Sequence, residues 1–282
     1  MQIHPRENPT NPSNLTQLFA AQKSAFQTAA ATSCDERIAY LRRLEQVLRR
    51  HETAIIHAVA ADFGQRSAPE TQLADIGAVL QAIHYTCKNL PQWMRPTACA
   101  TDVSIWPARA YTLAKPKGVV GIIAPWNFPV NLCLLPLVDA LAAGNRVMLK
   151  PSELTPHTAQ LLQKILGECF SPTQVCIVAP GIATPGTEPG AAQAIAEAFA
   201  RLPFDHLLFT GSTRVGRKIA QAAAANLTPV TLELGGKSPL IVGDDIALTR
   251  AAEMVGIGKL FNAGQTCIAP DYLLVPRAKT QK

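Results

Sequence analysis

Residues 119–123 read Val119-Val120-Gly121-Ile122-Ile123, the first of five short, β-branched runs that recur at helix-length intervals. The other four runs occupy residues 146–149, 175–178, 207–209 and 230–232. Strands that alternate with helices predict an α/β fold, with a parallel sheet covered by helices on both faces. Ligands of such folds bind beyond the carboxyl ends of the strands. We therefore expect the functional site where each strand gives way to its helix.

The chain on either side of this alternation has its own patterns. Apolar residues at helical spacing predict a helix capped by Ser13, a second helix behind Asp35 that continues through Ile55, and a third over residues 69–91. Residues 100–116, around Pro107, predict an extended arm or hairpin. Residues 180–189, rich in Pro, Gly and Thr, predict a surface insertion. A helix over 246–261 and a strand over 272–275 complete the expected elements.

Composition excludes several classes of protein. The 282 residues are 48% hydrophobic and 16% charged, which argues against disorder and is typical of a folded chain of two domains. The 26 basic and 20 acidic residues give a net charge of +6, but the excess lies in helix-like stretches, so we expect no nucleic-acid partner. Pro125 and Asn127 are among the residues that interrupt the apolar stretch 119–149, so we expect no membrane span. Residues 1–13 lack the apolar segment of a signal peptide.

The cysteines indicate a compartment. There are seven, an odd number, and none forms a C-x-x-C pair. This pattern favours a reducing, cytoplasmic location and predicts no metal site.

Polar and glycine-containing segments follow the predicted strands. They are Pro125-Trp126-Asn127-Phe128-Pro129, Lys150-Pro151-Ser152-Glu153, Phe209-Thr210-Gly211-Ser212-Thr213 continuing to Gly216, Leu232-Glu233-Leu234-Gly235-Gly236-Lys237 and, after the predicted helix over 246–261, Asn262-Ala263-Gly264-Gln265-Thr266-Cys267. Each segment alone is a weak signal, and the general dinucleotide motif G-x-G-x-x-G is absent. In this order and spacing they resemble the NAD(P)-dependent aldehyde dehydrogenase superfamily. The continuation from Cys267 to Tyr272 resembles its class 3 and coniferyl aldehyde dehydrogenase branch.

The resemblance implies a Rossmann-type parallel sheet that binds NAD, with NADP possible as an alternative cofactor. It implies an aromatic or medium-chain aliphatic aldehyde substrate and a homo-oligomer, most simply a dimer. On this basis residues 1–99 are the N-terminal helices of a cofactor domain, 100–116 an oligomerisation arm, 117–235 the NAD-binding core, and 236–282 the beginning of a truncated catalytic domain. We expect a fragment with weak NAD affinity at most, no aldehyde oxidation of its own and a tendency to aggregate.

Three residues are candidates for catalysis. Aldehyde oxidation by covalent catalysis needs a soft nucleophile, and Cys267 is the candidate, with the other six cysteines read as buried structural residues. Glu233 is the candidate base for the water that hydrolyses the thioester, although an ordinary salt-bridged glutamate fits the same pattern. Asn127 is the candidate oxyanion donor, together with the backbone N–H of Cys267, although it also fits a turn asparagine.

A second set of residues is expected to bind the cofactor. Lys150 and Glu153 fit the hydroxyls of the adenosine ribose, and a carboxylate there disfavours a 2′-phosphate; the same residues also fit a capping pair for the next helix, together with Ser152 and Thr155. Gly211, Ser212 and Gly216 predict a helix N-terminus that meets the pyrophosphate. The resemblance adds Pro125, Trp126, Asn127, Glu233, Leu234 and Gly235 to the cofactor-binding set.

Two other functions stay open at this point. One is a nucleotide-binding remnant without catalysis. The other is a thiol hydrolase that pairs Cys267 with His206 and needs no cofactor, although a histidine beside Asp205 at the start of an apolar strand is more typical of a hydrogen-bonded core residue.

Overall fold

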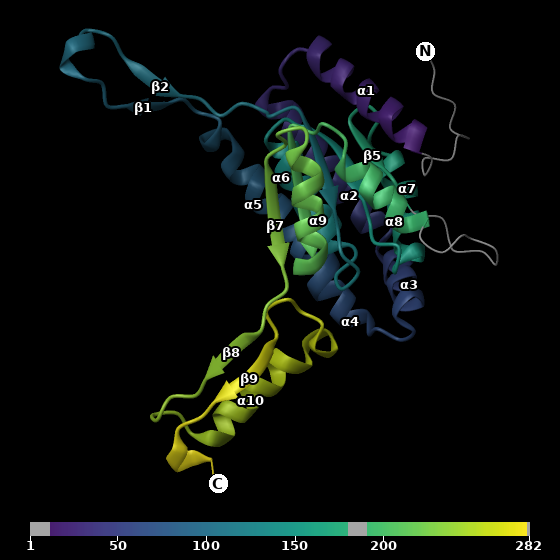
Figure 1. The fold of residues 1–282 in the computed structure, drawn as a ribbon, viewed down its shortest axis with the longest axis vertical. Helices are drawn as coiled ribbons and strands as arrows, with labels where there is room; N and C mark the ends of the chain where they lie inside the picture. The colour runs from purple at the N-terminus through teal and green to yellow at the C-terminus, as the bar shows by residue number, and fades with distance from the viewer. Residues whose placement is uncertain (1–11, 180–190, 281–282) are drawn as a thin grey trace.

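The computed structural model describes residues 12–179 and 191–280, and its centre is a five-stranded parallel sheet (Figure 1). The strands follow the order β5-β4-β3-β6-β7, and every neighbouring pair is parallel. Their bounds are β3 (Val119–Ile123), β4 (Arg146–Lys150), β5 (Val175–Ile177), β6 (His206–Gly211) and β7 (Val230–Leu234). The five predicted strands and the α/β fold are confirmed. The predicted surface insertion at 180–189 lies outside the described residues.

The strand order reverses at β3. The chain builds β4 and β5 on one side of β3, then returns past it to place β6 and β7 on the other. Ile123 at the end of β3 pairs with Lys150 of β4 and with Phe209 of β6, so the carboxyl ends of the central strands lie at one edge. A crevice between loops forms where such a reversal occurs, because the connections leave β3 and β6 in opposite directions.

Helices cover both faces of the sheet. Val120 and Ile122 pack into one core cluster, whereas Val119 and Ile123 pack into the other, as the two-residue period of a strand requires. The first cluster takes most of its helical residues from α2 (Cys34–Arg50), α3 (Glu52–Phe63), α5 (Ala78–Trp93), α6 (Asn131–Ala142) and α7 (Pro156–Gly167). The second takes them from α1 (Pro12–Thr28), α8 (Ala191–Ala200) and α9 (Thr213–Ala224). Both faces of the sheet are therefore buried.

The N-terminal helices differ in detail from their prediction. Helix α1 begins at Pro12, ahead of the Ser13 predicted as its cap. The cap of α2 is Ser33, not Asp35, because the Ser33 side chain accepts from the Glu36 backbone and the Glu36 side chain accepts in return, a capping box. The single helix predicted from Asp35 through Ile55 is in fact two helices, because α2 ends and α3 begins on either side of His51. The third is confirmed over α4 (Ala68–Thr71), a π-helical turn η1 (Gln72–Gly77) and α5.

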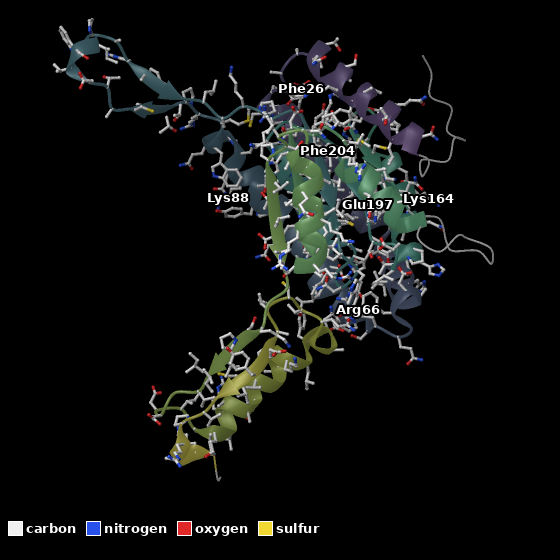
Figure 2. All side chains as sticks on the ribbon, viewed as in Figure 1. Phe26, Arg66, Lys88, Lys164, Glu197 and Phe204 are labelled. Atoms are coloured by element: carbon white, nitrogen blue, oxygen red, sulfur yellow. The ribbon has the colours of Figure 1, made fainter. Side chains whose placement is uncertain are left out.

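A hairpin projects from the body of the protein (Figures 1 and 2). Its strands β1 (Thr97–Cys99) and β2 (Ala110–Thr112) are antiparallel and enclose the short helix η2 (Val103–Ile105). The predicted hairpin is therefore present, but its paired strands begin at Thr97, before residue 100. Val103 is 86% exposed and Trp106 80% exposed, so its tip is apolar and uncovered.

A second, smaller unit follows β7. It consists of β8 (Ser238–Ile241), α10 (Leu248–Leu260) and β9 (Pro270–Leu274), with the short helices η3 (Phe261–Gly264) and η4 (Arg277–Lys279). Strands β8 and β9 are parallel and joined through α10, which confirms the predicted helix and strand. Ile241, Ile257 and Ile268 are each 74–75% exposed. In the described part of the chain, no helix combines the length and apolarity that crossing a membrane requires.

Candidate functional site

The loop after β3 and the loop before β9 meet at the carboxyl edge of the sheet. The Asn127 side-chain Nδ2 donates to the backbone oxygen of Gln265 at 2.8 Å. The Asn262 side-chain Nδ2 donates in turn to the backbone oxygen of Asn127, also at 2.8 Å. Two reciprocal hydrogen bonds therefore join the segments of the predicted oxyanion donor and the predicted nucleophile, although 135 residues separate Asn127 from Asn262.

Cys267 is an exposed free thiol in the turn that follows η3. Of the other six cysteines, four are buried, and burial raises the pKa of Cys169 to about 11 and that of Cys176 to about 12. The prediction that all six are buried is wrong for Cys99, which is exposed on the hairpin, while Cys34 is half-buried. Of the exposed thiols, Cys267 is the one at the carboxyl edge of the sheet.

The backbone just before Cys267 is left-handed at three consecutive residues. Asn262, Ala263 and Gly264 have φ values of 50°, 52° and 77°. This region is ordinary for glycine and tolerated by asparagine, but costs free energy for alanine. The Asn262 backbone N–H donates to the carboxylate of Glu70, a residue of α4. The turn is thus held from outside its own segment.

A buried ion pair lies beneath the Asn127 loop. Arg66 Nη1 and Asp75 Oδ2 are 3.0 Å apart, and both side chains are excluded from solvent. Asp75 Oδ1 also accepts the backbone N–H groups of Val130 at 3.1 Å and Asn131 at 2.8 Å, which satisfies the start of α6. Burial raises the pKa of Asp75, and the charge of Arg66 opposes that rise.

Arg66 reaches the predicted site directly. Its Nη1 donates to the backbone oxygen of Asn127 at 3.3 Å, and its guanidinium lies 5.2 Å and 5.1 Å from the ring centroids of Phe63 and Phe128. Sequence reasoning missed Arg66, Asp75 and Glu70 because these residues precede the sheet and nothing local marks their partners.

Glu233 lies at the carboxyl edge of the sheet, near the end of β7. Its neighbour in the ladder is Thr210 of β6, and its side chain is exposed. The next residues close the edge, with the Gly235 backbone N–H donating to the Gly211 oxygen at 3.3 Å. Among the described residues no hydrogen bond or ion pair joins Glu233 to Cys267. The role of Glu233 therefore stays a prediction.

His206 lies at the opposite edge. It opens β6, a strand of six residues, so at about 3.3 Å per residue it lies roughly 16 Å from Gly211 at the carboxyl end. Its Nε2 lies 2.9 Å from the Thr231 hydroxyl, and burial, together with the charge of Lys117, lowers its pKa. The hydrolase interpretation, which needs His206 beside Cys267, finds no support in this placement.

Lys150 and Glu153 form an ion pair where β4 ends. Lys150 is buried, and its Nζ lies 3.0 Å from Glu153 Oε2, whereas the Glu153 side chain is 45% exposed. Burial alone would raise the pKa of Glu153, but the adjacent Lys150 charge and hydrogen bond outweigh it and hold that pKa below its ordinary value. A fixed ammonium and a half-exposed carboxylate therefore stand together beside the end of β3.

The alternative that this pair, with Ser152 and Thr155, caps α7 is wrong. Thr155 occupies the N-cap position but makes no side-chain cap hydrogen bond. The cap comes from Asp62 of α3, whose carboxylate accepts the backbone N–H groups of His157 at 3.0 Å and Thr158 at 2.8 Å. The N-terminus of α7 is therefore capped by a carboxylate distant in sequence. Lys150 and Glu153 do not cap the helix and are available for another role.

Helix α9 begins directly behind β6. The predicted strand-to-helix turn is present, and Ser212 is the helix N-cap, whose hydroxyl accepts the Val215 N–H at 3.3 Å. A Cβ on Gly216 would lie 2.9 Å from the Leu234 side chain, so glycine allows the helix to approach β7 closely. The first turn carries no acidic residue. Together with the Lys150 pair at the reversal of strand order, this arrangement fits a dinucleotide with its pyrophosphate at the helix N-terminus.

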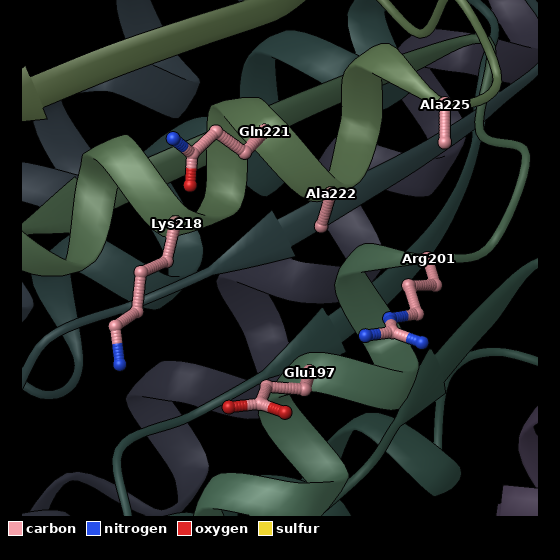
Figure 3. A pocket seen from close by; sticks show the side chains of 6 residues that line it. All are labelled: Glu197, Arg201, Lys218, Gln221, Ala222 and Ala225. Atoms are coloured by element: carbon pink, nitrogen blue, oxygen red, sulfur yellow. The ribbon is translucent and has the colours of Figure 1, made fainter.

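An open groove between α8 and α9 lies outside this set of residues (Figure 3). Its volume is about 490 Å³, and it is lined by Glu197, Arg201, Lys218, Gln221, Ala222 and Ala225. None of these was predicted as a site residue. Within residues 12–179 and 191–280, no group of three His, Cys, Asp or Glu side chains is placed to hold a metal ion.

Comparison with known proteins gives the family. The Aldehyde dehydrogenase family profile matches residues 9–282. A protein of Pseudomonas aeruginosa named "Probable coniferyl aldehyde dehydrogenase" is 46% identical over 268 residues, which is 95% of this chain and 54% of the relative. The substrate-bound state of Staphylococcus aureus AldH is 36% identical with a TM-score of 0.85, and the match covers 93% of this chain and 55% of that one.

A third comparison concerns a protein solved with a cofactor. The NAD⁺ complex of aldehyde dehydrogenase from Bacillus cereus is 28% identical with a TM-score of 0.83, and the match covers 96% of this chain and 53% of that one. The chain thus spans about half the length of the relatives it matches. The profile match over nearly all of the sequence and the shared fold lead to one conclusion: the chain belongs to the aldehyde dehydrogenase family.

Proposed function

We propose that these residues, in a protein of the relatives' full length, oxidise an aldehyde to a carboxylic acid with NAD(P)⁺ through a covalent intermediate on Cys267. The observation that carries the proposal is the pair of hydrogen bonds between the Asn127 loop and the Cys267 turn. They join the loop of a neutral amide donor to the turn that leads to an exposed thiol, near the reversal of strand order, where α/β folds bind their ligands.

In the proposed reaction the Cys267 thiol first loses its proton to water, and the resulting thiolate attacks the carbonyl carbon. The S–C bond forms as the carbonyl π bond breaks, so the carbonyl oxygen takes the negative charge. The Asn127 amide has two N–H groups, one of which is donated to the Gln265 oxygen. That bond orients the amide and leaves the second N–H for the oxyanion, together with the backbone N–H of Cys267. An oxyanion donor of this kind contributes about 3 kcal/mol to the transition state.

Glu233 is the proposed base of the hydrolytic step. It takes a proton from the water that attacks the thioester carbon, and the acid then leaves as the Cys267 sulfur is released. Its exposure at the end of β7 suits a carboxylate that must reach water. The absence of a direct bond to Cys267 among the described residues fits a base that acts through water rather than on the thiol.

The cofactor, when bound, supplies the acceptor for the hydride that leaves the substrate carbon. Lys150 and Glu153 would hold the adenosine ribose, and the carboxylate would favour NAD over NADP because it repels a 2′-phosphate. The N-terminus of α9, at Gly211, Ser212 and Gly216, would face the pyrophosphate. Pro125, Trp126, Leu234 and Gly235 would line the path between the two ends of the cofactor.

The substrate we propose is an aromatic aldehyde of the coniferyl type, which the name of the Pseudomonas aeruginosa relative supports. The apolar tip of the β1–β2 hairpin supports a homo-oligomer formed through this arm. For residues 1–282 alone we propose weak NAD affinity at most and no oxidation, because apolar side chains of the β8–α10–β9 unit, which carries Cys267, stand uncovered.

The central test replaces the nucleophile. In a full-length protein that carries these residues, we expect Cys267→Ser to lose aldehyde oxidation while keeping NAD binding, because a hydroxyl of high pKa cannot replace the thiolate. Formation of reduced cofactor measures the first property, and fluorescence titration with NAD measures the second. Cys99→Ser, which changes the other exposed thiol, is the matched control. Near-normal turnover in Cys267→Ser would refute the assignment.

Glu233→Gln tests the second step. We expect a burst of reduced cofactor followed by slow steady turnover, because hydride transfer precedes the water step. Loss of the burst would instead assign Glu233 to activation of the thiol.

A further inference from the structure

We propose that Glu70 and Asn262 are positioning residues that lock the left-handed turn before Cys267 onto the loop of Asn127. The proposal rests on the proposed function only in taking Cys267 as the nucleophile. The proposal is argued from three hydrogen bonds. Asn262 donates one to Glu70 and one to the Asn127 oxygen, and Arg66 donates the third to the same oxygen.

Asn262 is bound at both ends. Its backbone N–H donates to Glu70 Oε1, and its side-chain Nδ2 donates to the Asn127 oxygen at 2.8 Å. The residue is 3% exposed, and its partners Glu70 and Asn127 are half-buried. Without its acceptor the N–H of Asn262 would be a donor of a buried residue with no partner, which costs free energy. Asn262 is therefore a latch between the two loops.

The turn needs such a latch because its backbone is strained. Residues 262–264 all have positive φ, and Ala263 has neither the freedom of glycine nor a polar side chain that compensates for this conformation. A segment in such a conformation persists only where its surroundings over-determine it. The backbone conformation of residues 262–264 sets the direction of the chain that follows, and so determines where Gln265 and Cys267 lie relative to Asn127.

Residues 66–70, which run from the connection after α3 into α4, bind both loops. Arg66 donates to the Asn127 oxygen, and Glu70, four residues on, accepts from Asn262. Arg66 is itself fixed by its buried ion pair with Asp75. The Asn127 oxygen thus accepts hydrogen bonds from both Arg66 and Asn262, and Glu70 accepts a third from the Asn262 backbone. The base of the site is rigid where the two loops are joined.

The experiment is hydrogen exchange read by mass spectrometry on the 282-residue chain, without substrate or cofactor. Glu70→Ala removes the acceptor, whereas Glu70→Gln keeps an oxygen at the same position without the charge. Because Glu70→Ala leaves the N–H of the buried residue Asn262 without its acceptor, we expect it to speed exchange in peptides covering 261–267 by about tenfold or more. Glu70→Gln should stay within about threefold of the parent, since an amide oxygen still accepts the bond.

Two further variants separate the latch from the strain. Asn262→Gly keeps a residue suited to positive φ but loses the side-chain bond, so it should speed exchange at residues 125–130. Ala263→Gly relieves strain without touching either bond, so it should leave exchange at 261–267 unchanged or slower. Peptides of β3 and β4 serve as the internal reference in every variant.

Three results would overturn the proposal. An unchanged exchange rate at 261–267 in Glu70→Ala would show that the Glu70 carboxylate does not stabilise the turn. Equal acceleration in Glu70→Ala and Glu70→Gln would show that the oxygen is not the relevant group. Acceleration that spreads to β3 and β4 would show a general role in the fold. None of these variants changes Cys267, so a failed Cys267→Ser test would leave this result standing.

Discussion

The two parallel sheets of this protein use the same local pattern and reach opposite degrees of burial. All five residues of β3 are buried, as are the last four of β4. Strand β8 alternates between half-buried and exposed residues, and four of the five residues of β9 are exposed. Both sheets contain parallel strands joined through a helix, so the difference lies in what covers them.

Coverage decides the contribution of a strand to stability. The central sheet has helices on both faces, and its side chains belong to two core clusters. The small sheet has α10, whose side chains at Met254, Ile257 and Leu260 are themselves 54–75% exposed. Burial of apolar area yields about 25 cal/mol per Å². A βαβ unit therefore specifies the path of its backbone, but its stability depends on the layers that pack against it.

The largest predicted effect comes from a matched pair of leucines. Leu149 of β4 is fully buried and Leu273 of β9 is 49% exposed. We expect Leu149→Ala to lower the free energy of unfolding by about 2–5 kcal/mol, because it leaves a cavity in a packed core. Leu273→Ala should cost less than about 1 kcal/mol, because half of its surface already meets water. Urea unfolding measures both, and equal losses would contradict the comparison.

A middle-sized effect concerns helix caps in the two units. The Asp62 carboxylate caps α7 through three hydrogen bonds, two to backbone N–H groups and one from the Thr158 hydroxyl. Helix α10 follows Ala247, which makes no side-chain cap bond. We expect Asp62→Ala to cost about 1–2 kcal/mol and Ala247→Asp to stabilise α10 by about 0.5–1 kcal/mol.

Thermal unfolding checks the first variant, and hydrogen exchange in α10 checks the second. If Asp62→Ala leaves the free energy of unfolding unchanged, Ser152 or Thr155 caps α7 in place of Asp62.

The smallest effect concerns the ion pairs at the strand ends. Because the folded pKa of Glu153 is lowered, its pairing with Lys150 stabilises the fold above the ordinary glutamate pKa and is lost as pH falls through the folded value. With its side chain 45% exposed, we expect Glu153→Gln to cost less than about 1 kcal/mol at pH 7, and this difference should vanish in acid.

The control is the corresponding pair of the small unit, Lys237 with Asp271 at 2.9 Å, where Lys237 is 80% exposed. Asp271→Asn should have no measurable effect on unfolding at any pH. A loss from Asp271→Asn as large as that from Glu153→Gln would mean that burial of the lysine does not distinguish the two pairs.

Sequence alone determined the features that depend on neighbouring residues. The β-branched runs, each followed by a helix-length segment, predicted the five parallel strands, and the polar segments after them predicted the carboxyl edge at which the Asn127 loop contacts Gln265. The small residues Gly211, Ser212 and Gly216 likewise predicted the strand-to-helix turn between β6 and α9. These predictions succeed because strand periodicity and turn chemistry act within a few residues.

Only the tertiary structure decided the features that join distant parts of the chain. The cap of α7 comes from Asp62, 95 residues before His157, and the acceptor for Asn262 is Glu70, 192 residues away. In the pair beneath Asn127, Arg66 lies in the connection between α3 and α4 and Asp75 lies in η1, both ahead of the sheet. A carboxylate has no sequence-local sign of which distant N–H it will meet, because burial and packing select that partner only when the layers come together.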